Sequence, residues 1–274
     1  MPRILNSCQP SPTRCPLLLG GLDACRWLAL GRRTARTPIL ERAGPPRPCT
    51  VPAPPLLKIC GLRDPLQAAA VAELGVDAIG VIAVASSPRF LAAADRPGLF
   101  AAVRAVAPAC LGVLVVANPS PEQLAELDPA MGHQVLQLHG EESPHTCRQL
   151  RGQLGCQVWK ALRLRSPEDL QRAATYAGAV DALLLDAWVS GQLGGTGHAV
   201  PLDWLQGWQA PLPWWLAGGV RPERVTELLR QVQPTGLDAS SGVERSPGDK
   251  DLQRVRQLLR CLPGRDPLEL GSQG

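Results

Sequence analysis

The sequence predicts an α/β protein whose main domain is a (β/α)8 barrel, also called a TIM barrel. From Leu56 onward, eight short apolar runs of high β-propensity alternate strictly with eight helix-length amphipathic stretches over about 200 residues. The predicted strands are apolar almost throughout, as expected when parallel strands are buried on both faces. No glycine-rich dinucleotide-binding motif follows the first strand, which disfavours a doubly wound sheet.

Each predicted strand is short and ends where polar residues or glycines begin. The strands are predicted at Leu56–Cys60, Ala78–Ala83, Cys110–Val116, Gln134–Leu138, Gln157–Leu162, Ala182–Asp186, Trp214–Ala217 and Gly236–Ala239. Helices are predicted near 65–74, 95–107, 121–127, 144–154, 167–176, 201–208, 221–231 and 249–261. Four helices begin with a capping residue followed by proline at the first helical position: Asp64-Pro65, Ser120-Pro121, Ser143-Pro144 and Ser166-Pro167.

Residues 1–55 differ from the rest of the chain in charge and in proline content. This segment holds eight arginines, two acidic residues and 11 of the 28 prolines, so it carries +6. The whole chain carries +4, and the remaining residues therefore carry −2. We expect a disordered or weakly ordered extension, followed by the barrel at 56–262 and a tail at 263–274. A transit peptide, a nucleic-acid-binding arm and a misread upstream sequence are the alternatives for the extension.

The composition excludes several broad classes of protein. Hydrophobic residues make up 45% of the chain and charged residues 19%, which excludes global disorder. No run approaches the 18 or so apolar residues of a transmembrane helix, so no membrane partner is expected. The nine cysteines include no Cys-x-x-Cys pair, which argues against a disulfide framework and for a reducing compartment.

In such barrels the chemistry lies at the C-terminal ends of the strands. In this sequence those ends carry Cys60-Gly61, Ser87-Pro88-Arg89, Asn118, Gln137 to Gly140, Arg163, Asp186, Gly218-Gly219 and Asp238 to Gly242. Alternation along a strand places Lys58 and Cys60 on one face, and Leu184 and Asp186 on one face. If both faces point inward, Cys60 and Asp186 meet across one mouth from strands that are not neighbours.

Six motifs along the chain resemble, in order and spacing, those of the phosphoribosylanthranilate isomerase family of tryptophan biosynthesis. They are Leu57 to Leu62, Ser87 to Arg89, Leu136 to Gly140, Leu185-Asp186 with Gly194 to Gly197, Leu216 to Val220, and Asp238 to Glu244 with Pro247 to Asp251. The resemblance covers residues 56–261. Two positions depart from the family pattern: Arg224 replaces a usual asparagine, and Ala187 replaces a small hydroxyl residue.

The resemblance implies an Amadori rearrangement that converts an aldose to a ketose and needs neither a metal nor an organic cofactor. It implies that Asp186 is the general acid and Cys60 the general base. It also implies substrate binding by Arg89, Gln137, His139, Gly218, Gly219, Asp238, Ser240, Ser241 and Gly242. A thiolate base normally needs its pKa lowered from about 8.5, and a carboxylic acid needs its pKa raised from about 3.9.

Individual roles follow from the chemistry of the side chains. Arg89 is expected to bind the substrate carboxylate, because a guanidinium matches that group with two hydrogen bonds. Lys58 is a candidate electrostatic partner of Cys60, with a structural ion pair as the alternative for both Lys58 and Lys160. The glycines at 218–219 and the segment 240–242 are expected to hold the phosphate through backbone N–H groups, and 194–197 to form a closing loop.

Other polar and aromatic residues have simpler interpretations. His139 is alternatively a residue that orients loops, and the spacing of His133, His139, His145 and Cys147 fits no structural zinc site. We expect four cysteines to be packing residues and four tryptophans to pack helices against the outside of the barrel: Cys110, Cys147, Cys156 and Cys261, and Trp204, Trp208, Trp214 and Trp215.

The expected partner is a small phosphosugar–anthranilate substrate, with no nucleic acid. We expect a monomer in the cytoplasm, or in the plastid stroma if the extension is a transit peptide. Two alternative functions remain. One is another phosphate-binding sugar isomerase or synthase of the same barrel group, and the other is a catalytically silent barrel that binds a phosphate ligand.

Overall fold

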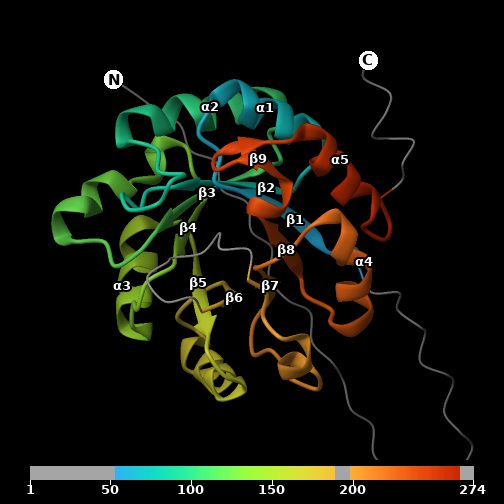
Figure 1. Ribbon diagram of the computed structural model, residues 1–274. Coiled ribbons are helices and arrows are strands. Elements are labelled where there is room, and N and C mark those ends of the chain that lie inside the picture. The colour runs from blue at the N-terminus through green and yellow to red at the C-terminus, as the bar shows by residue number, and fades with distance from the viewer. Residues whose placement is uncertain (1–52, 189–197, 266–274) are drawn as a thin grey trace, which may run out of the picture. The chain divides into compact units, whose positions relative to one another are not determined.

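Eight parallel strands form a closed barrel in the computed structural model, which describes residues 53–188 and 198–265 (Figure 1). The strands pair in chain order, and β8 returns to pair with β1. They are β1 (Leu56–Cys60), β2 (Ala78–Ile82), β3 (Leu111–Val116), β4 (Val135–Leu138), β5 (Gln157–Leu164), β6 (Ala182–Ala187), β7 (Trp214–Leu216) and β8 (Gly236–Ala239). The predicted fold class is confirmed.

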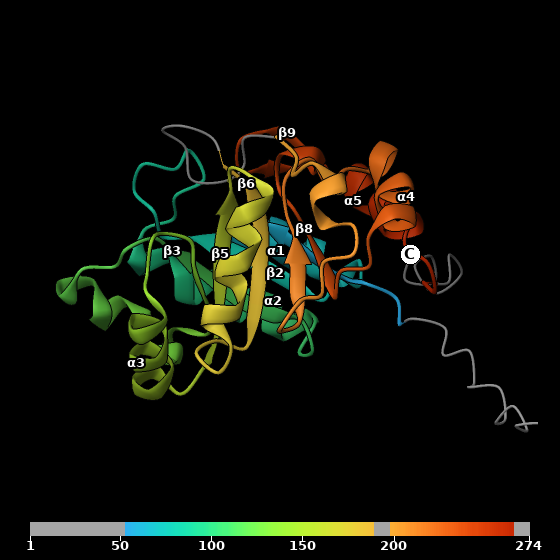
Figure 2. The same cartoon turned by 90° about the horizontal axis from the view of Figure 1, so that it is seen from below.

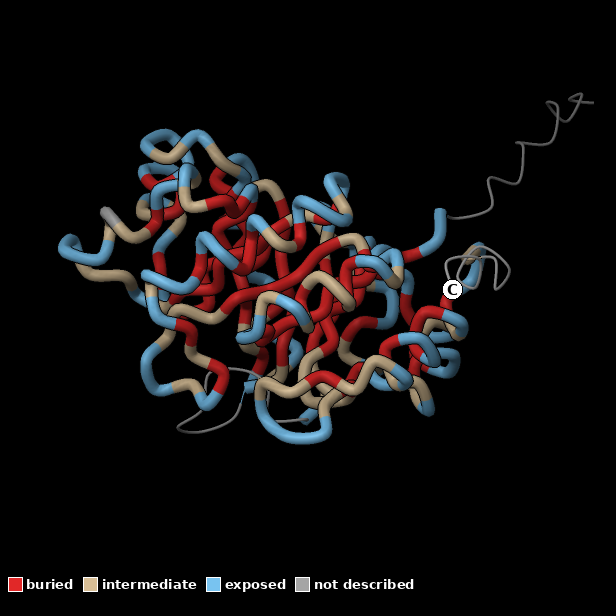
Figure 3. The backbone as a smooth tube through the Cα atoms, turned by 90° about the horizontal axis from the view of Figure 1, so that it is seen from above, coloured by how far each residue is buried: buried red, intermediate tan, exposed pale blue. Residues whose placement is uncertain are grey.

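Five α-helices surround the described part of the barrel: α1 (Pro65–Glu73), α2 (Arg96–Val106), α3 (Pro144–Leu154), α4 (Pro222–Gln231) and α5 (Leu252–Arg260) (Figures 1 and 2). Asp64 and Ser143 cap α1 and α3 through their side chains, as their position before proline predicts. Buried residues concentrate in the strands and on the inner sides of the helices (Figure 3).

Three of the predicted helices are 3-10 helices: η2 (Pro121–Leu127), η4 (Pro167–Tyr176) and η5 (Leu202–Leu205). Short additional 3-10 turns occur at η1 (Ala93–Asp95), η3 (Pro129–Met131) and η6 (Ser241–Val243). Apolar residues spaced three apart lie on one side of a 3-10 helix as well as of an α-helix. The sequence pattern therefore predicted a helix correctly at these places but not its type.

The last predicted helix begins too early in the sequence prediction. Residues Asp249–Lys250 form β10, which pairs antiparallel with β9 (Glu244–Ser246), so α5 starts only at Leu252. The side chain of Asp251 caps α5 by accepting hydrogen bonds from the backbone N–H groups of Gln253 and Arg254. The hairpin of β9 and β10 lies beside the C-terminal end of β8 (Figure 1).

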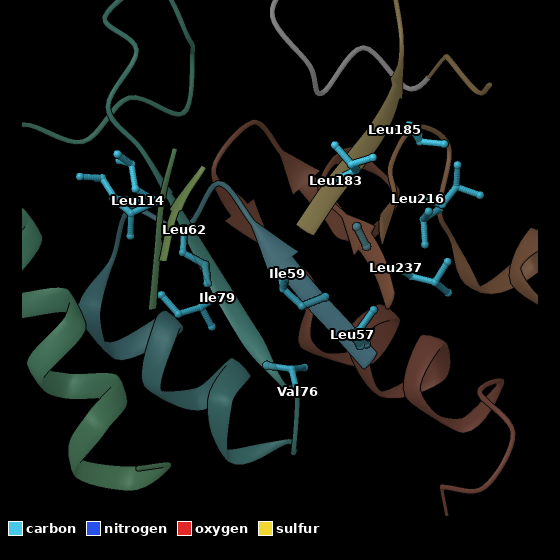
Figure 4. Close-up of a cluster of buried hydrophobic side chains, with 14 of the residues drawn as sticks. Leu57, Ile59, Leu62, Val76, Ile79, Leu114, Leu183, Leu185, Leu216 and Leu237 are labelled. Carbon is cyan, nitrogen blue, oxygen red and sulfur yellow. The ribbon is translucent and has the colours of Figure 1, made fainter. Parts of the chain in front are cut away.

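The core has two layers, because successive side chains along each strand point alternately to the outer and the inner face of the barrel. Leucine, isoleucine and valine side chains on the outer face of the barrel pack against the helices, including Leu57, Ile59, Ile79, Leu183, Leu185 and Leu237 (Figure 4). The inner face holds a second cluster in which Trp159 and Trp215 stack with ring centroids 4.7 Å apart. The expectation that Trp215 packs outside is wrong, because neighbouring strand residues point to opposite faces and Trp214 takes the outer one, against Trp208.

Cys110 and Cys147 lie in the outer core, and Cys156 and Cys261 pack against it, which confirms their predicted packing role. None of the helices in the described part of the chain is long and apolar enough to cross a membrane. Nearly all of the extension at 1–55, most of the tail at 263–274 and the glycine loop at 194–197 lie outside the described residues.

Candidate active site

One pocket at the C-terminal end of the barrel is lined by all eleven site residues named from the sequence. They are Cys60, Arg89, Gln137, His139, Asp186, Gly218, Gly219, Asp238, Ser240, Ser241 and Gly242. Ser87 and five apolar residues that were not named as site residues complete the lining: Ile82, Val84, Val115, Ala217 and Val220. Their apolar character made them indistinguishable from ordinary core residues in the sequence.

Cys60 lies at the end of β1 with 6% of its surface exposed. Gly80 on β2 lies beside it, and a Cβ there would lie 2.8 Å from the Cys60 Sγ and 3.1 Å from the Lys58 Cε. The thiol and the lysine side chain therefore occupy the space that glycine leaves open.

Burial has the largest effect on the pKa of the Cys60 thiol, and the nearby charges act in both directions: Lys58 and Lys250 lower it and Asp238 raises it. Burial raises the pKa of the Cys60 thiol, and the Lys58 ammonium works in the opposite direction without overcoming it. The pKa of Cys60 is therefore shifted in the opposite direction to the one that a thiolate base normally needs. Lys58 is itself fully buried, and its Nζ lies 3.0 Å from the Asp238 Oδ1.

Asp186 faces the pocket from β6, with 4% of its surface exposed. Its Oδ1 accepts a hydrogen bond of 2.9 Å from the backbone N–H of Ala187, and its Oδ2 lies 3.5 Å from the His139 Nε2. The Gln137 Nε2 donates to the His139 Nδ1 at 3.1 Å, which places the ring proton on the nitrogen that faces Asp186. Gln137 thus orients His139 toward the carboxylate.

Arg89 lines the pocket but is already held by a carboxylate. Its Nε and Nη2 donate to the Oε1 and Oε2 of Glu244 at 2.9 and 2.7 Å. Its Cδ would lie 2.4 Å from a Cβ at position 61, where Gly61 has a φ of +86°. Glu244, on β9, and its second partner Lys250 belong to a quoted motif, but nothing in the sequence pattern indicates that Glu244 contacts both Arg89 and Lys250.

Two glycines of the pocket wall lie where a side chain would meet the backbone of a neighbouring segment. A Cβ at Gly218, where φ is +83°, would lie 2.4 Å from the His198 carbonyl oxygen, and one at Gly242 would lie 2.1 Å from the Val220 carbonyl oxygen. The backbone N–H groups of Gly218 and Gly219 donate no hydrogen bond to another described residue. Free N–H groups on a glycine backbone are suited to an anion such as phosphate.

Lys160 and the other histidines have no place in this pocket. The Lys160 Nζ donates to the Glu142 Oε2 at 3.0 Å and to the Gly140 carbonyl oxygen at 2.7 Å, so it stabilises the loop after β4. His133 packs on the ring of Phe100. Among the described residues no three potential metal ligands gather in one place.

Known proteins resemble this chain in sequence over nearly the whole barrel. A family model for N-(5′-phosphoribosyl)anthranilate (PRA) isomerase matches residues 57–260. The N-(5′-phosphoribosyl)anthranilate isomerase of Thermosynechococcus vestitus is 47% identical over 216 residues, which cover 78% of this chain and 92% of that protein. That of Synechococcus elongatus is 48% identical over 209 residues, covering 75% and 95%.

Solved structures of the same enzyme share the fold. Phosphoribosylanthranilate isomerase from Thermotoga maritima superposes with a TM-score of 0.67 at 27% identity, covering 76% of this chain and 98% of that one. A phosphoribosylanthranilate isomerase in complex with reduced 1-(o-carboxyphenylamino)-1-deoxyribulose 5-phosphate gives a TM-score of 0.61 at 27% identity, covering 74% and 96%. This chain belongs to the N-(5′-phosphoribosyl)anthranilate isomerase family.

Proposed function

We propose that this chain converts N-(5′-phosphoribosyl)anthranilate to 1-(2-carboxyphenylamino)-1-deoxyribulose 5-phosphate in tryptophan biosynthesis, with Asp186 as general acid and Cys60 as general base. One observation carries the assignment of roles. A carboxylic acid on β6 and a thiol on β1, two strands that are not neighbours, line the same pocket. A substrate between them has one proton-transfer group on each side.

The reaction needs two proton transfers in sequence. Asp186 gives its proton to the ribose ring oxygen as the ring opens and the anilino nitrogen forms an iminium. Cys60 as thiolate then takes the proton from C2′, and the resulting enolamine tautomerises to the ketose. Product and substrate have the same atoms and oxidation level overall, so the proposed residues supply proton transfer alone.

Binding is assigned to the remaining residues of the pocket. Arg89 holds the anthranilate carboxylate through the N–H groups that Glu244 leaves available. The backbone at Gly218-Gly219 and at Ser240 to Gly242 holds the phosphate, and the N–H groups of Gly218 and Gly219, which donate to no other described residue, support this assignment. Gln137, His139 and Asp238 contact the sugar or hold the acid and base in place.

We further propose a monomeric enzyme of the cytoplasm, or of the plastid stroma if residues 1–55 are a transit peptide. Its substrate is a small molecule, and no nucleic acid or membrane takes part.

Growth of a tryptophan-requiring host that lacks this isomerase tests the proposed activity. The intact chain should restore growth without tryptophan, whereas C60S and D186N expressed to the same level should not. Intact protein that binds the reduced product analogue without restoring growth would instead indicate a catalytically silent barrel. Turnover confined to a different phosphorylated aminoaldose would indicate another isomerase of the same barrel group.

A further inference from the structure

Glu244 makes more contacts with pocket residues than the proposed acid–base chemistry requires. Its side chain is 4% exposed, and its Oε1 accepts from the Arg89 Nε, the Gly248 N–H and the Lys250 Nζ. Its Oε2 accepts from the Arg89 Nη2 at 2.7 Å. Two cations therefore share one buried carboxylate, and the three groups together carry +1.

Lys250 connects this group to the base-bearing strand. Its fully buried Nζ lies 2.5 Å from the Glu244 Oε1 and 2.5 Å from the carbonyl oxygen of Cys60. The same carbonyl also accepts a hydrogen bond from the Ser240 Oγ at 3.0 Å. Lys250 thus links Glu244, in the β9–β10 hairpin, to the end of β1.

The pairing leaves a defined part of Arg89 for a ligand. A guanidinium has five N–H groups, and Glu244 takes the Nε–H and one Nη2–H. The edge formed by Nη1 and the second Nη2–H makes no hydrogen bond with another described residue, and Arg89 lines the pocket. Two parallel N–H groups on that edge match a carboxylate.

We propose that Glu244 is a positioning residue for substrate recognition: it holds the Arg89 guanidinium so that the Nη1–Nη2 edge meets the carboxylate of the aryl amine. This rests on the proposed role of Arg89. Holding a long side chain in its binding geometry beforehand removes an entropic cost from the binding step. The repulsion between Glu244 and the incoming carboxylate is offset because Arg89 and Lys250 leave the group with a positive charge.

The chain offers a control in a second buried arginine, Arg96, whose carboxylate partner Glu126 is 44% exposed. Arg96 on α2 is 2% exposed, and its Nη1 lies 3.2 Å from the Glu126 Oε2. Neither residue lines the pocket. E126Q therefore removes a carboxylate from a buried arginine without touching the substrate site.

The test compares two substrates, the phosphoribosyl adducts of anthranilate and of aniline, which lacks the carboxylate. E244Q should raise KM for the anthranilate adduct about tenfold and leave kcat within threefold. It should leave KM for the aniline adduct unchanged, and E126Q should leave both unchanged. In an R89A background E244Q should add less than a twofold change, because its effect passes through Arg89.

The outcomes separate this inference from the proposed role of Arg89. If R89A leaves the preference for anthranilate intact, Arg89 does not bind the carboxylate and the proposed function fails at that point. The positioning role is overturned if R89A abolishes the preference for the anthranilate adduct but E244Q keeps it. It is also overturned if E244Q raises KM for both adducts equally. If E244Q does not fold, E244D serves instead, because it keeps the charge on a side chain that is one methylene shorter. E244D should lose part of the preference for the anthranilate adduct, and an unchanged preference overturns the positioning role.

Discussion

The Lys58 ammonium lies 3.0 Å from the Asp238 carboxylate, and Lys58 and Asp238 lie opposite each other in the parallel pairing of β1 with β8. Burial alone would lower the pKa of Lys58, but its ion pair and hydrogen bond with Asp238 act in the opposite direction, and the pKa is raised. Lys58 therefore remains protonated at neutral pH. It presents a fixed positive charge to the thiol of Cys60.

The state of Cys60 should follow pH in a defined direction. Because burial raises the pKa of its thiol, the reactive thiolate is a minor species at neutral pH and increases with pH. The rate of Cys60 alkylation by iodoacetamide, followed by mass spectrometry, should rise about tenfold per pH unit from pH 6 to 8. K58M should slow this alkylation further at every pH, because it removes a positive charge that lowers the pKa of the thiol, and K58R, which keeps a positive charge there, is the control. A rate that is flat from pH 6 to 8 would contradict a raised pKa.

Arg89 should contribute to binding more than to the chemical step. R89A should raise KM more than it lowers kcat, because the carboxylate is held in ground and transition states alike. Losing a charge-assisted contact should cost about 1.5–3 kcal/mol, or roughly 10- to 150-fold. R89K should rescue little, because one ammonium cannot pair with Glu244 and the carboxylate as a guanidinium does. Steady-state kinetics that leave KM unchanged in both variants would remove Arg89 from the binding site.

Gly80 should be required for the geometry of the base. In G80A the new methyl group would lie 2.8 Å from the Cys60 Sγ, so the thiol or the strand must shift. We expect kcat to fall at least about tenfold, since small displacements of a reacting group cost up to about 10²-fold. G98A on α2 is the control, because nothing lies within 4 Å of a Cβ there and alanine should stabilise the helix by about 0.5–1 kcal/mol. Equal kcat in both variants would show that the pocket tolerates the methyl group.

The barrel should not need the arginine-rich extension. The first strand begins at Leu56, and each site residue lies beyond it. A chain that starts at Pro55 should fold, keep its melting temperature and turn over substrate as the full chain does, while its net charge changes from +4 to −2. A tenfold loss of activity or an insoluble product would show that the extension packs on the barrel.

The sequence was sufficient to predict the barrel because its apolar strand runs and amphipathic helix patterns are both strong. Apolar strands such as Leu56–Cys60 and Gly236–Ala239 end at the residues predicted for them, since polar groups and glycines follow at once. The sequence was insufficient where one residue pattern is compatible with two different local structures. Residues 167–176 satisfy both a 3-10 and an α-helix, and Trp214-Trp215 reads as one aromatic patch although its members face opposite layers.

The position of the site could be predicted from the sequence, but the side-chain contacts within it could not. Residues at strand ends must gather at one edge of a parallel barrel, so Cys60 and Asp186 could be placed near one mouth without coordinates. The contact of Glu244 with Arg89 spans 155 positions of the chain and depends on the β9–β10 hairpin. A short hairpin after the last strand leaves no periodic signal, and its residues read as the start of a helix.

The acid–base pair is tested most directly by kcat and analogue binding in C60S and D186N. Each variant should lose at least about 10²-fold in kcat, the usual contribution of a general acid or base. Both should bind the reduced product analogue with near-native affinity and keep their melting temperature, because the phosphate and carboxylate contacts are untouched. If both variants retain more than about a tenth of the wild-type kcat, well short of that loss, Cys60 and Asp186 are not the base and the acid.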